Sequence, residues 1–179
     1  DRNKTVLVRF DLNIPLDDLS GKINDRLTRI KVTINQLQAL NSKIVILSHL
    51  GRPKGAVNQD LSLKQIINQL EEVLNSKVNF INDCIGEEVK KKIDSFDQSS
   101  IILLENCRFH KGEEENNIEF AKKLSELADV YVNDAFGCVH RSHASVDAIT
   151  KYMPSYVGNL LDEELQNLRN ITDKPESPS

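Results

Sequence analysis

Arginine and histidine residues gather in four short segments of this sequence, and both residue types bind anions. The segments are residues 9–15 (RFDLNIP), 48–55 (SHLGRPKG), 103–110 (LLENCRFH) and 133–145 (NDAFGCVHRSHAS). Each holds an arginine, whose planar guanidinium group can bind two oxygens of a carboxylate or phosphate at once. Because the chain has a formal net charge of −4, any anion site must be a local cluster of cations. The pattern predicts binding of a small, multiply charged anion, and a phosphorylated acid fits this description best.

Each of these segments contains or follows the end of a short apolar run typical of a β-strand. Five such runs cover residues 5–10, 43–47, 78–81, 101–104 and 129–132. They are continuously apolar, which is typical of strands covered on both faces. Helical periodicity is seen between them, over residues 27–40, 63–74 (with Ser62 as a plausible N-cap), 85–93 and 118–127, and a further helix is expected over residues 156–171. The alternation predicts an α/β fold: an open parallel sheet with helices on both faces, a Rossmann-like three-layer sandwich.

In an open parallel sheet, ligands bind beyond the carboxyl ends of the strands. The polar residues at or just after the strand ends are therefore the candidates for a site. They are Arg9, Asp11, Asn13, His49, Arg52, Arg108, His110, His140, Arg141 and His143. Their shared placement predicts that they meet at one edge of the sheet.

Each candidate also has a structural interpretation. A single arginine after a strand is more often part of a surface ion pair, and Asp11 and Asn13 are equally compatible with capping a turn. His140 and His143 have a spacing compatible with metal binding, but no third ligand is evident nearby, so no metal site is predicted. His110 is expected to be structural or solvated. The acidic run 113–115 is expected to be a solvated helix entrance.

Composition excludes several classes of protein. Apolar residues make up 39% and charged residues 28% of the 179 residues, which indicates a globular domain. The acidic balance argues against a nucleic-acid-binding protein, and no apolar run approaches the ~20 residues of a membrane span. Three well-separated cysteines, Cys84, Cys107 and Cys138, are expected in or near the core of a protein from a reducing compartment. Neither common glycine-rich nucleotide-binding motif, G-x-x-x-x-G-K-[ST] or G-x-G-x-x-G, is present.

The four segments, together with residues 29–31 (RIK), resemble the signature motifs of the phosphoglycerate kinase family, in the family's order and over essentially the whole chain. The resemblance implies an enzyme that reversibly transfers a phosphoryl group between 1,3-bisphosphoglycerate and ADP, giving 3-phosphoglycerate and Mg-ATP in glycolysis. It implies that residues 1–172 are the amino-terminal, substrate-binding domain and that residues 173–179 begin an interdomain linker. The nucleotide-binding domain is expected to be absent from this chain, which alone should be inactive.

The resemblance also implies a role for each candidate residue. Contacts with the substrate's hydroxyl and carboxyl end are expected from Asp11 and Asn13. The distant phosphate is expected to be held by Arg52, Arg108 and Arg141, with His49 alongside. More peripheral members of the basic patch are expected to be Arg9 and His140.

The same resemblance implies that Arg29 is the catalytic residue. In the family, the matching arginine approaches the phosphoryl group that is transferred. Arg26 lies close enough to Arg29 in sequence to be confused with it, and the Ile30–Lys31 pair that follows favours Arg29. In the ATP-consuming direction the acceptor is a carboxylate, which is already ionised at neutral pH, so no general base is needed. Such a transfer depends on positioning and on charge stabilisation.

The expected ligands are 3-phosphoglycerate or 1,3-bisphosphoglycerate, with Mg-ATP or Mg-ADP bound by the missing domain and no cofactor bound by this chain. No nucleic acid or membrane partner is expected. The protein is expected to be a cytoplasmic monomer, with a plastid location left open. Two other classes remain as alternatives: a non-catalytic anion-binding module on the same fold, and a metal-dependent hydrolase built on Asp11, Asp134 and the His140/His143 pair.

Overall fold

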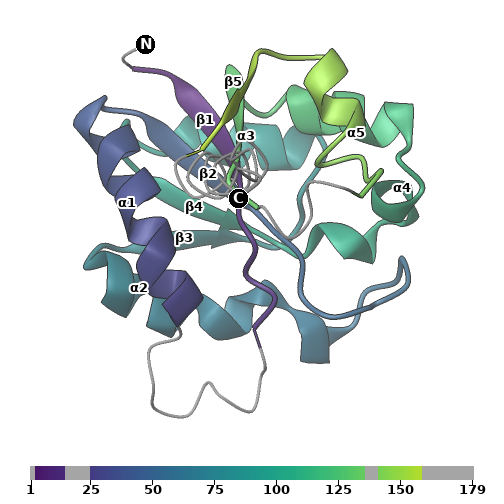
Figure 1. Ribbon diagram of the computed structural model, residues 1–179, viewed down its shortest axis with the longest axis horizontal. Coiled ribbons are helices and arrows are strands. Elements are labelled where there is room, and N and C mark those ends of the chain that lie inside the picture. The colour runs from purple at the N-terminus through teal and green to yellow at the C-terminus, as the bar shows by residue number, and fades with distance from the viewer. Residues whose placement is uncertain (1–2, 15–24, 136–140, 159–179) are drawn as a thin grey trace, which may run out of the picture.

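A single parallel sheet forms the centre of the protein. The computed structural model describes residues 3–14, 25–135 and 141–158, and in this part of the chain the sheet has the strand order β3-β4-β2-β1-β5-β6 (Figure 1). The strands are β1 (Thr5–Arg9), β2 (Lys43–Leu47), β3 (Val78–Ile81), β4 (Ile101–Leu104), β5 (Val130–Asn133) and β6 (Ser155–Val157). The five strands predicted from apolar runs are confirmed, with ends that differ by at most one residue.

The helices connect these strands. They are α1 (Asp25–Ala39), α2 (Ile67–Leu74), α3 (Glu87–Ser95), α4 (Lys111–Glu114) and α5 (Ile118–Ser125), with short 3₁₀ helices at Gln59–Leu61, Leu63–Ile66, Cys107–Phe109 and Ala148–Lys151. The helix predicted over 63–74 is divided, because its first turn is a 3₁₀ helix. Ser62 caps that turn by accepting from the Lys64 backbone N–H, and the buried Glu105 carboxylate accepts from the Leu63 N–H.

The helix predicted over residues 156–171 is wrong at its start, and residues 159–171 lie outside the described part of the chain. Tyr156 and Val157 belong to β6, where they pair in parallel with Val132 and Asn133 of β5. The backbone N–H and C=O groups on the outer edge of β5 can form hydrogen bonds with any extended segment that lies alongside them. A strand of three residues is too short to give a recognisable pattern in the sequence.

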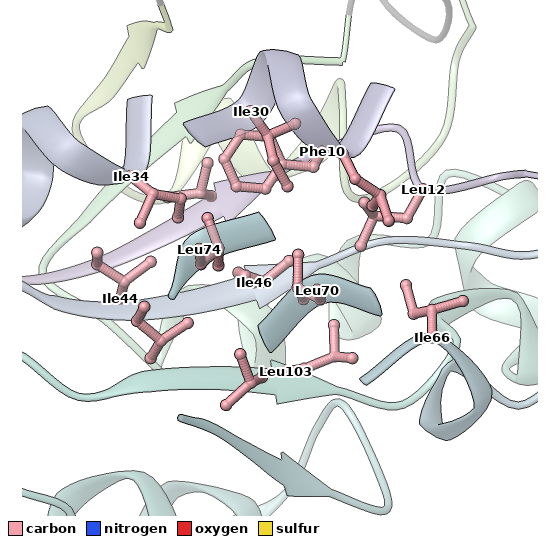
Figure 2. Close-up of a cluster of buried hydrophobic side chains, with 14 of the residues drawn as sticks. Phe10, Leu12, Ile30, Ile34, Ile44, Ile46, Ile66, Leu70, Leu74 and Leu103 are labelled. Atoms are coloured by element: carbon pink, nitrogen blue, oxygen red, sulfur yellow. The ribbon is translucent and has the colours of Figure 1, made fainter. Parts of the chain in front are cut away.

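Helices cover both faces of the sheet, as predicted (Figure 1). On one face, α1 and α2 pack on alternate strand residues; Figure 2 shows Ile34, Leu70 and Leu74 against Ile44 and Ile46 of β2. On the other face, the remaining strand residues pack with α3 and α5 in a second buried cluster. Since successive strand residues point to opposite faces, a sheet covered on both sides requires the continuous apolar runs seen in the sequence.

The strand register determines where the candidate residues lie. Arg9, the last residue of β1, is paired with Leu47 at the end of β2 and with Asn133 at the end of β5. The loops after these three strands therefore leave the sheet side by side at one edge. None of the helices in the described residues is both long and apolar enough to cross a membrane.

Candidate functional site

The turn after β1 is linked by hydrogen bonds to the loop after β2. Asp11 Oδ1 accepts from the Asn13 backbone N–H over 3.1 Å, and Asn13 Oδ1 accepts from the Gly51 N–H over 2.9 Å. Gly51 has φ +62°, and a Cβ there would lie 2.7 Å from Leu61 Cδ2, so this position favours glycine. Asp11 and Asn13 thus do shape a turn, as the structural interpretation expected, and the Asp11 carboxylate remains partly exposed.

Arg26 joins the same turn, although the sequence motif favours Arg29. Its Nη1 donates to Asp11 Oδ1 over 3.2 Å and to the Asn13 carbonyl over 2.7 Å. Arg29 lies one turn further along α1 and is exposed. Arg26 lies three residues before Arg29, and this spacing places both side chains on one side of a helix. The spacing could have predicted that a second arginine lies near the site.

Arg9 lies beneath the loops and not at their surface, which corrects its expected place at the periphery of a basic patch. Its side chain is fully buried. Nε donates to Ser145 Oγ over 3.0 Å, Nη1 donates to the Phe10 carbonyl and to Ser48 Oγ, and Nη2 lies 2.7 Å from His49 Nδ1. A buried guanidinium needs such a set of acceptors. Arg9 therefore holds together the segments that carry the candidate site.

His49 is uncharged in this environment. Burial, and then the positive charges of Arg9, Arg108, Arg141 and the nearby His143, lower the pKa of His49 to about 2. Because an arginine can only donate, His49 Nδ1 is the acceptor and its Nε2 carries the proton. Hydrogen bonds from Arg9 to His49 and Ser145, and from Arg108 to Gly51, show that the loops after β2, β4 and β5 meet at the end of β1, as the sequence predicted.

Arg108 has unused hydrogen-bonding capacity. It is buried, its Nη1 donates to the Gly51 carbonyl over 3.3 Å, and its Nε lies 3.7 Å from Glu114 Oε1. Within the described residues, Nε and Nη2 of Arg108 are buried and have no hydrogen-bond partner. Leaving buried charged donors unpaired costs free energy. A ligand anion would supply the missing acceptors.

The acidic run 113–115 differs from its prediction, because Glu113 is fully buried and is not solvated. Its carboxylate accepts from Ser145 Oγ over 2.6 Å and from the Ser145 N–H over 3.2–3.3 Å. Burial raises the pKa of Glu113, and the charge of Arg9 and the bonds from Ser145 oppose this. Successive helical residues point about 100° apart. One glutamate of the run can therefore face the domain while the next two face solvent, which a run of identical charges in the sequence does not reveal.

The other cations predicted for the site lie at the protein surface or outside the described residues. Arg52 and Arg141 are exposed. His143 is partly buried, its Nδ1 has no hydrogen-bond partner in the described residues, and burial followed by the charge of Arg108 lowers its pKa. His140 lies outside the described residues.

The remaining predictions for these loops concern metal ligands and cysteines. Asp134 is buried and accepts from Thr33 Oγ1 over 2.7 Å. Among the described residues, Asp11, Asp134 and His143 do not form a group close enough to share one ion. Cys84 and Cys107 are buried core residues, as predicted, while Cys138 lies outside the described part.

Sequence comparison finds relatives over nearly the whole chain. A family model described as phosphoglycerate kinase matches residues 1–179. The phosphoglycerate kinase of Wolbachia sp. subsp. Drosophila simulans (strain wRi) is 49% identical over 178 residues, which are 98% of this chain and 44% of the relative. That of Bartonella henselae is 48% identical over 177 residues, with the same two coverages. The chain spans less than half the length of these curated relatives.

Solved structures agree with the sequence comparison. The structure of phosphoglycerate kinase from Coxiella burnetii matches with a TM-score of 0.86 and 35% identity, over 99% of this chain and 44% of that chain. The crystal structure of phosphoglycerate kinase from Pyrococcus horikoshii OT3 matches with a TM-score of 0.87 and 32% identity, over 99% and 45%.

Proposed function

Because the chain belongs to the phosphoglycerate kinase family, we propose that it is the part of such an enzyme that binds the phosphoglycerate. The enzyme would transfer a phosphoryl group reversibly between 1,3-bisphosphoglycerate and ADP, giving 3-phosphoglycerate and ATP. Residues 1–172 would form the substrate domain, and residues 173–179 would begin the connection to the nucleotide domain. A piece that spans 44% of its relatives' length would not complete the reaction alone.

The observation that carries this proposal is the unused hydrogen-bonding capacity of Nε and Nη2 of Arg108. These two nitrogen atoms are buried and have no hydrogen-bond partner in the described residues. The geometry of the guanidinium fork suits two phosphate oxygens. After burial, the charges of Arg9, Arg108 and Arg141 are the next causes of the lowered pKa of His49, so these charges act on the same region. A dianionic phosphate would offset this excess of positive charge.

Neutral His49 would contribute a hydrogen bond and no charge. Because Arg9 fixes Nδ1 as the acceptor, Nε2 carries the proton and would donate it in a hydrogen bond to a phosphate oxygen. The exposed Arg52 and Arg141 would complete the phosphate site from the loops after β2 and β5. Asp11 and Asn13, in the turn after β1, would contact the substrate's hydroxyl and carboxyl end.

Catalysis would depend on positioning and charge stabilisation. The attacking carboxylate of 3-phosphoglycerate is already ionised at neutral pH, so no general base is required. Arg29 on α1 would approach the phosphoryl group in transfer and stabilise its developing charge. Magnesium-bound nucleotide supplies the other reactant, and we assign its binding to the domain beyond residue 172. Closure of the two domains would exclude water from the reacting groups.

A calorimetric titration of the full-length protein with 3-phosphoglycerate, in EDTA at low ionic strength, tests the proposed site. We expect one saturable site whose affinity falls as salt is added, because charge pairs hold the phosphate. Glycerate, which lacks the phosphate, is the matched ligand control and should bind far more weakly. Equal affinities for the two ligands would contradict the phosphate site.

A coupled kinase assay separates the proposal from a non-catalytic anion-binding module. The full-length protein should form ATP from 1,3-bisphosphoglycerate and Mg-ADP. Binding of 3-phosphoglycerate without any turnover would favour the module and reject the kinase.

A further inference from the structure

A second group of potential ligands lies at the ends of β3 and β4, among residues that the proposed function does not use. Asp83 and Cys84 follow β3, and His110 follows the 3₁₀ helix after β4. The two strands pair in parallel, with Ile81 opposite Leu104, so the segments that follow them lie close together. One potential ligand atom from each of the three residues lies within 4.8 Å of the other two.

The three side chains are held in place by other contacts. His110 Nε2 lies 2.7 Å from Asp83 Oδ1, which also accepts from the Cys84 N–H over 2.7 Å. The imidazole packs on the ring of Phe120 with 5.4 Å between centroids. Such contacts restrict the rotamers of potential ligands and reduce the entropy lost when an ion binds.

The group is buried on one side and open on the other. Cys84 is fully buried, whereas the side chains of Asp83 and His110 are 46% and 32% exposed. Asp83 and His110 also line a cavity of about 470 Å³, with Phe80 and Phe109 among its other walls. This cavity gives an ion a path to the group and leaves room for a water molecule.

We propose that Asp83, Cys84 and His110 bind one divalent transition-metal ion, of which Zn²⁺ is the best match, with a water molecule from the cavity as the fourth ligand. A thiolate, an imidazole and a carboxylate are the ligands that Zn²⁺ takes in proteins. Mg²⁺ and Ca²⁺ prefer oxygen ligands alone, so a sulfur ligand selects against both. This site is separate from the Mg-nucleotide site that we assign to the other domain.

Only small movements would be needed. Donor atoms around tetrahedral Zn²⁺ lie about 2.0–2.3 Å from the ion, which places them roughly 3.3–3.8 Å from one another. The 2.7 Å contact between His110 and Asp83 would open by less than about 1 Å, and the longest separation would close by about 1 Å. Burial, followed by the effect of the neighbouring Cys107, raises the pKa of the Cys84 thiol well above its usual range, so an ion that binds there must displace the thiol proton.

A Co²⁺ titration of the metal-free, full-length protein tests the site directly, because Co²⁺ replaces Zn²⁺ and absorbs in the near ultraviolet when a thiolate binds it. We expect a thiolate-to-cobalt band that saturates at one equivalent and disappears when Zn²⁺ is added. Cys84→Ser should remove this band. The matched control is Cys107→Ser, which changes another buried cysteine outside the ligand set and should keep the band.

Two variants at partly exposed ligands guard against a folding defect in Cys84→Ser. Asp83→Asn and His110→Gln should keep the circular dichroism spectrum of the wild type. Loss of even an outer-shell partner weakens metal binding about 10–100-fold, so each should lower Zn²⁺ affinity at least about tenfold. The proposal would be overturned by a titration without a thiolate band. Unchanged Zn²⁺ affinity in both variants would overturn it as well, and would leave His110 and Asp83 as a structural pair joining two loops.

Discussion

Arg9 Nη2 donates a hydrogen bond to His49 Nδ1 over 2.7 Å, and both side chains are buried under the candidate phosphate site. This contact fixes one tautomer of His49 and keeps the imidazole neutral, because a protonated ring could not accept from a guanidinium. The fully buried Arg9 therefore determines which His49 nitrogen, Nε2, would face the proposed phosphate.

The first prediction concerns acid stability. The pKa of His49 is about 2 in the folded protein and 6.5 in the unfolded chain. Below pH 6.5 the unfolded state binds the additional proton, so the free energy of unfolding falls as the pH decreases, by about 1.4 kcal/mol per pH unit well below 6.5. His49→Asn keeps an acceptor for Arg9 and cannot be protonated. Urea unfolding of both proteins between pH 7 and pH 5 should show a shallower pH dependence in the variant.

His143, whose pKa is also lowered, contributes in the same direction in both proteins and cancels in this comparison. Above pH 7 the two proteins should have the same pH dependence. Parallel curves below pH 6.5 would mean that His49 is protonated in the folded state.

The second prediction concerns the buried Glu113. Its two carboxylate oxygens accept hydrogen bonds from the backbone N–H and the hydroxyl of Ser145. Glu113→Gln places an amide N–H where a donor already lies and removes the negative charge near Arg9. We expect a loss of about 1.5–3 kcal/mol in the free energy of unfolding, measured by urea denaturation with an unchanged m-value. The exposed neighbour Glu115 is the control, and Glu115→Gln should change stability by less than about 0.5 kcal/mol. Equal stability of the two variants would show that the charge of Glu113 is not needed.

The third prediction concerns the proposed phosphate site. Arg52→Ala, at an exposed position where folding is not at risk, should weaken 3-phosphoglycerate binding by about 1.5–3 kcal/mol, the range for a hydrogen bond to a charged group. Calorimetric titration of the full-length protein measures this. Lys54→Ala removes an exposed cation from the same loop and should have a much smaller effect. Similar losses in both variants would indicate general electrostatic attraction without specific binding by Arg52.

The fourth prediction concerns Arg29. If this residue stabilises the charge of the transferring phosphoryl group, Arg29→Ala in the full-length protein should lower kcat by about 10³-fold or more, the scale of a catalytic arginine in phosphoryl transfer. The KM for 3-phosphoglycerate should change much less, because the interaction is made mainly in the transition state. Steady-state kinetics in the ATP-consuming direction measure both values.

Arg26→Ala provides the comparison for this prediction, since Arg26 contacts Asp11 and Asn13. It should raise the KM more than it lowers kcat. The reverse pattern, with the larger loss of kcat in Arg26→Ala, would assign the catalytic role to Arg26.

The fold class and the family could both be predicted from the amino-acid sequence. Continuous apolar runs separated by helical periodicity predict a parallel sheet covered on both faces, since each pattern depends only on local geometry and burial. Long motifs in a fixed order predicted the phosphoglycerate kinase family, and the comparisons confirm it. The edge of the sheet that gathers the cationic residues also followed from the sequence, because parallel strands place all their carboxyl ends together.

Which charged side chains are buried could not be predicted from the sequence, because it depends on tertiary contacts. Arg9 and Arg108 were expected in a basic patch and Glu113 at a solvated helix entrance, yet all three side chains are buried. Their burial depends on acceptors and donors such as Ser145, which is 136 residues away from Arg9 along the chain. No local pattern encodes such a partner. The same reason explains why the sequence did not predict strand β6. It also explains why the proximity of Asp83, Cys84 and His110 was not predicted, because the sheet brings together segments that are distant in the sequence.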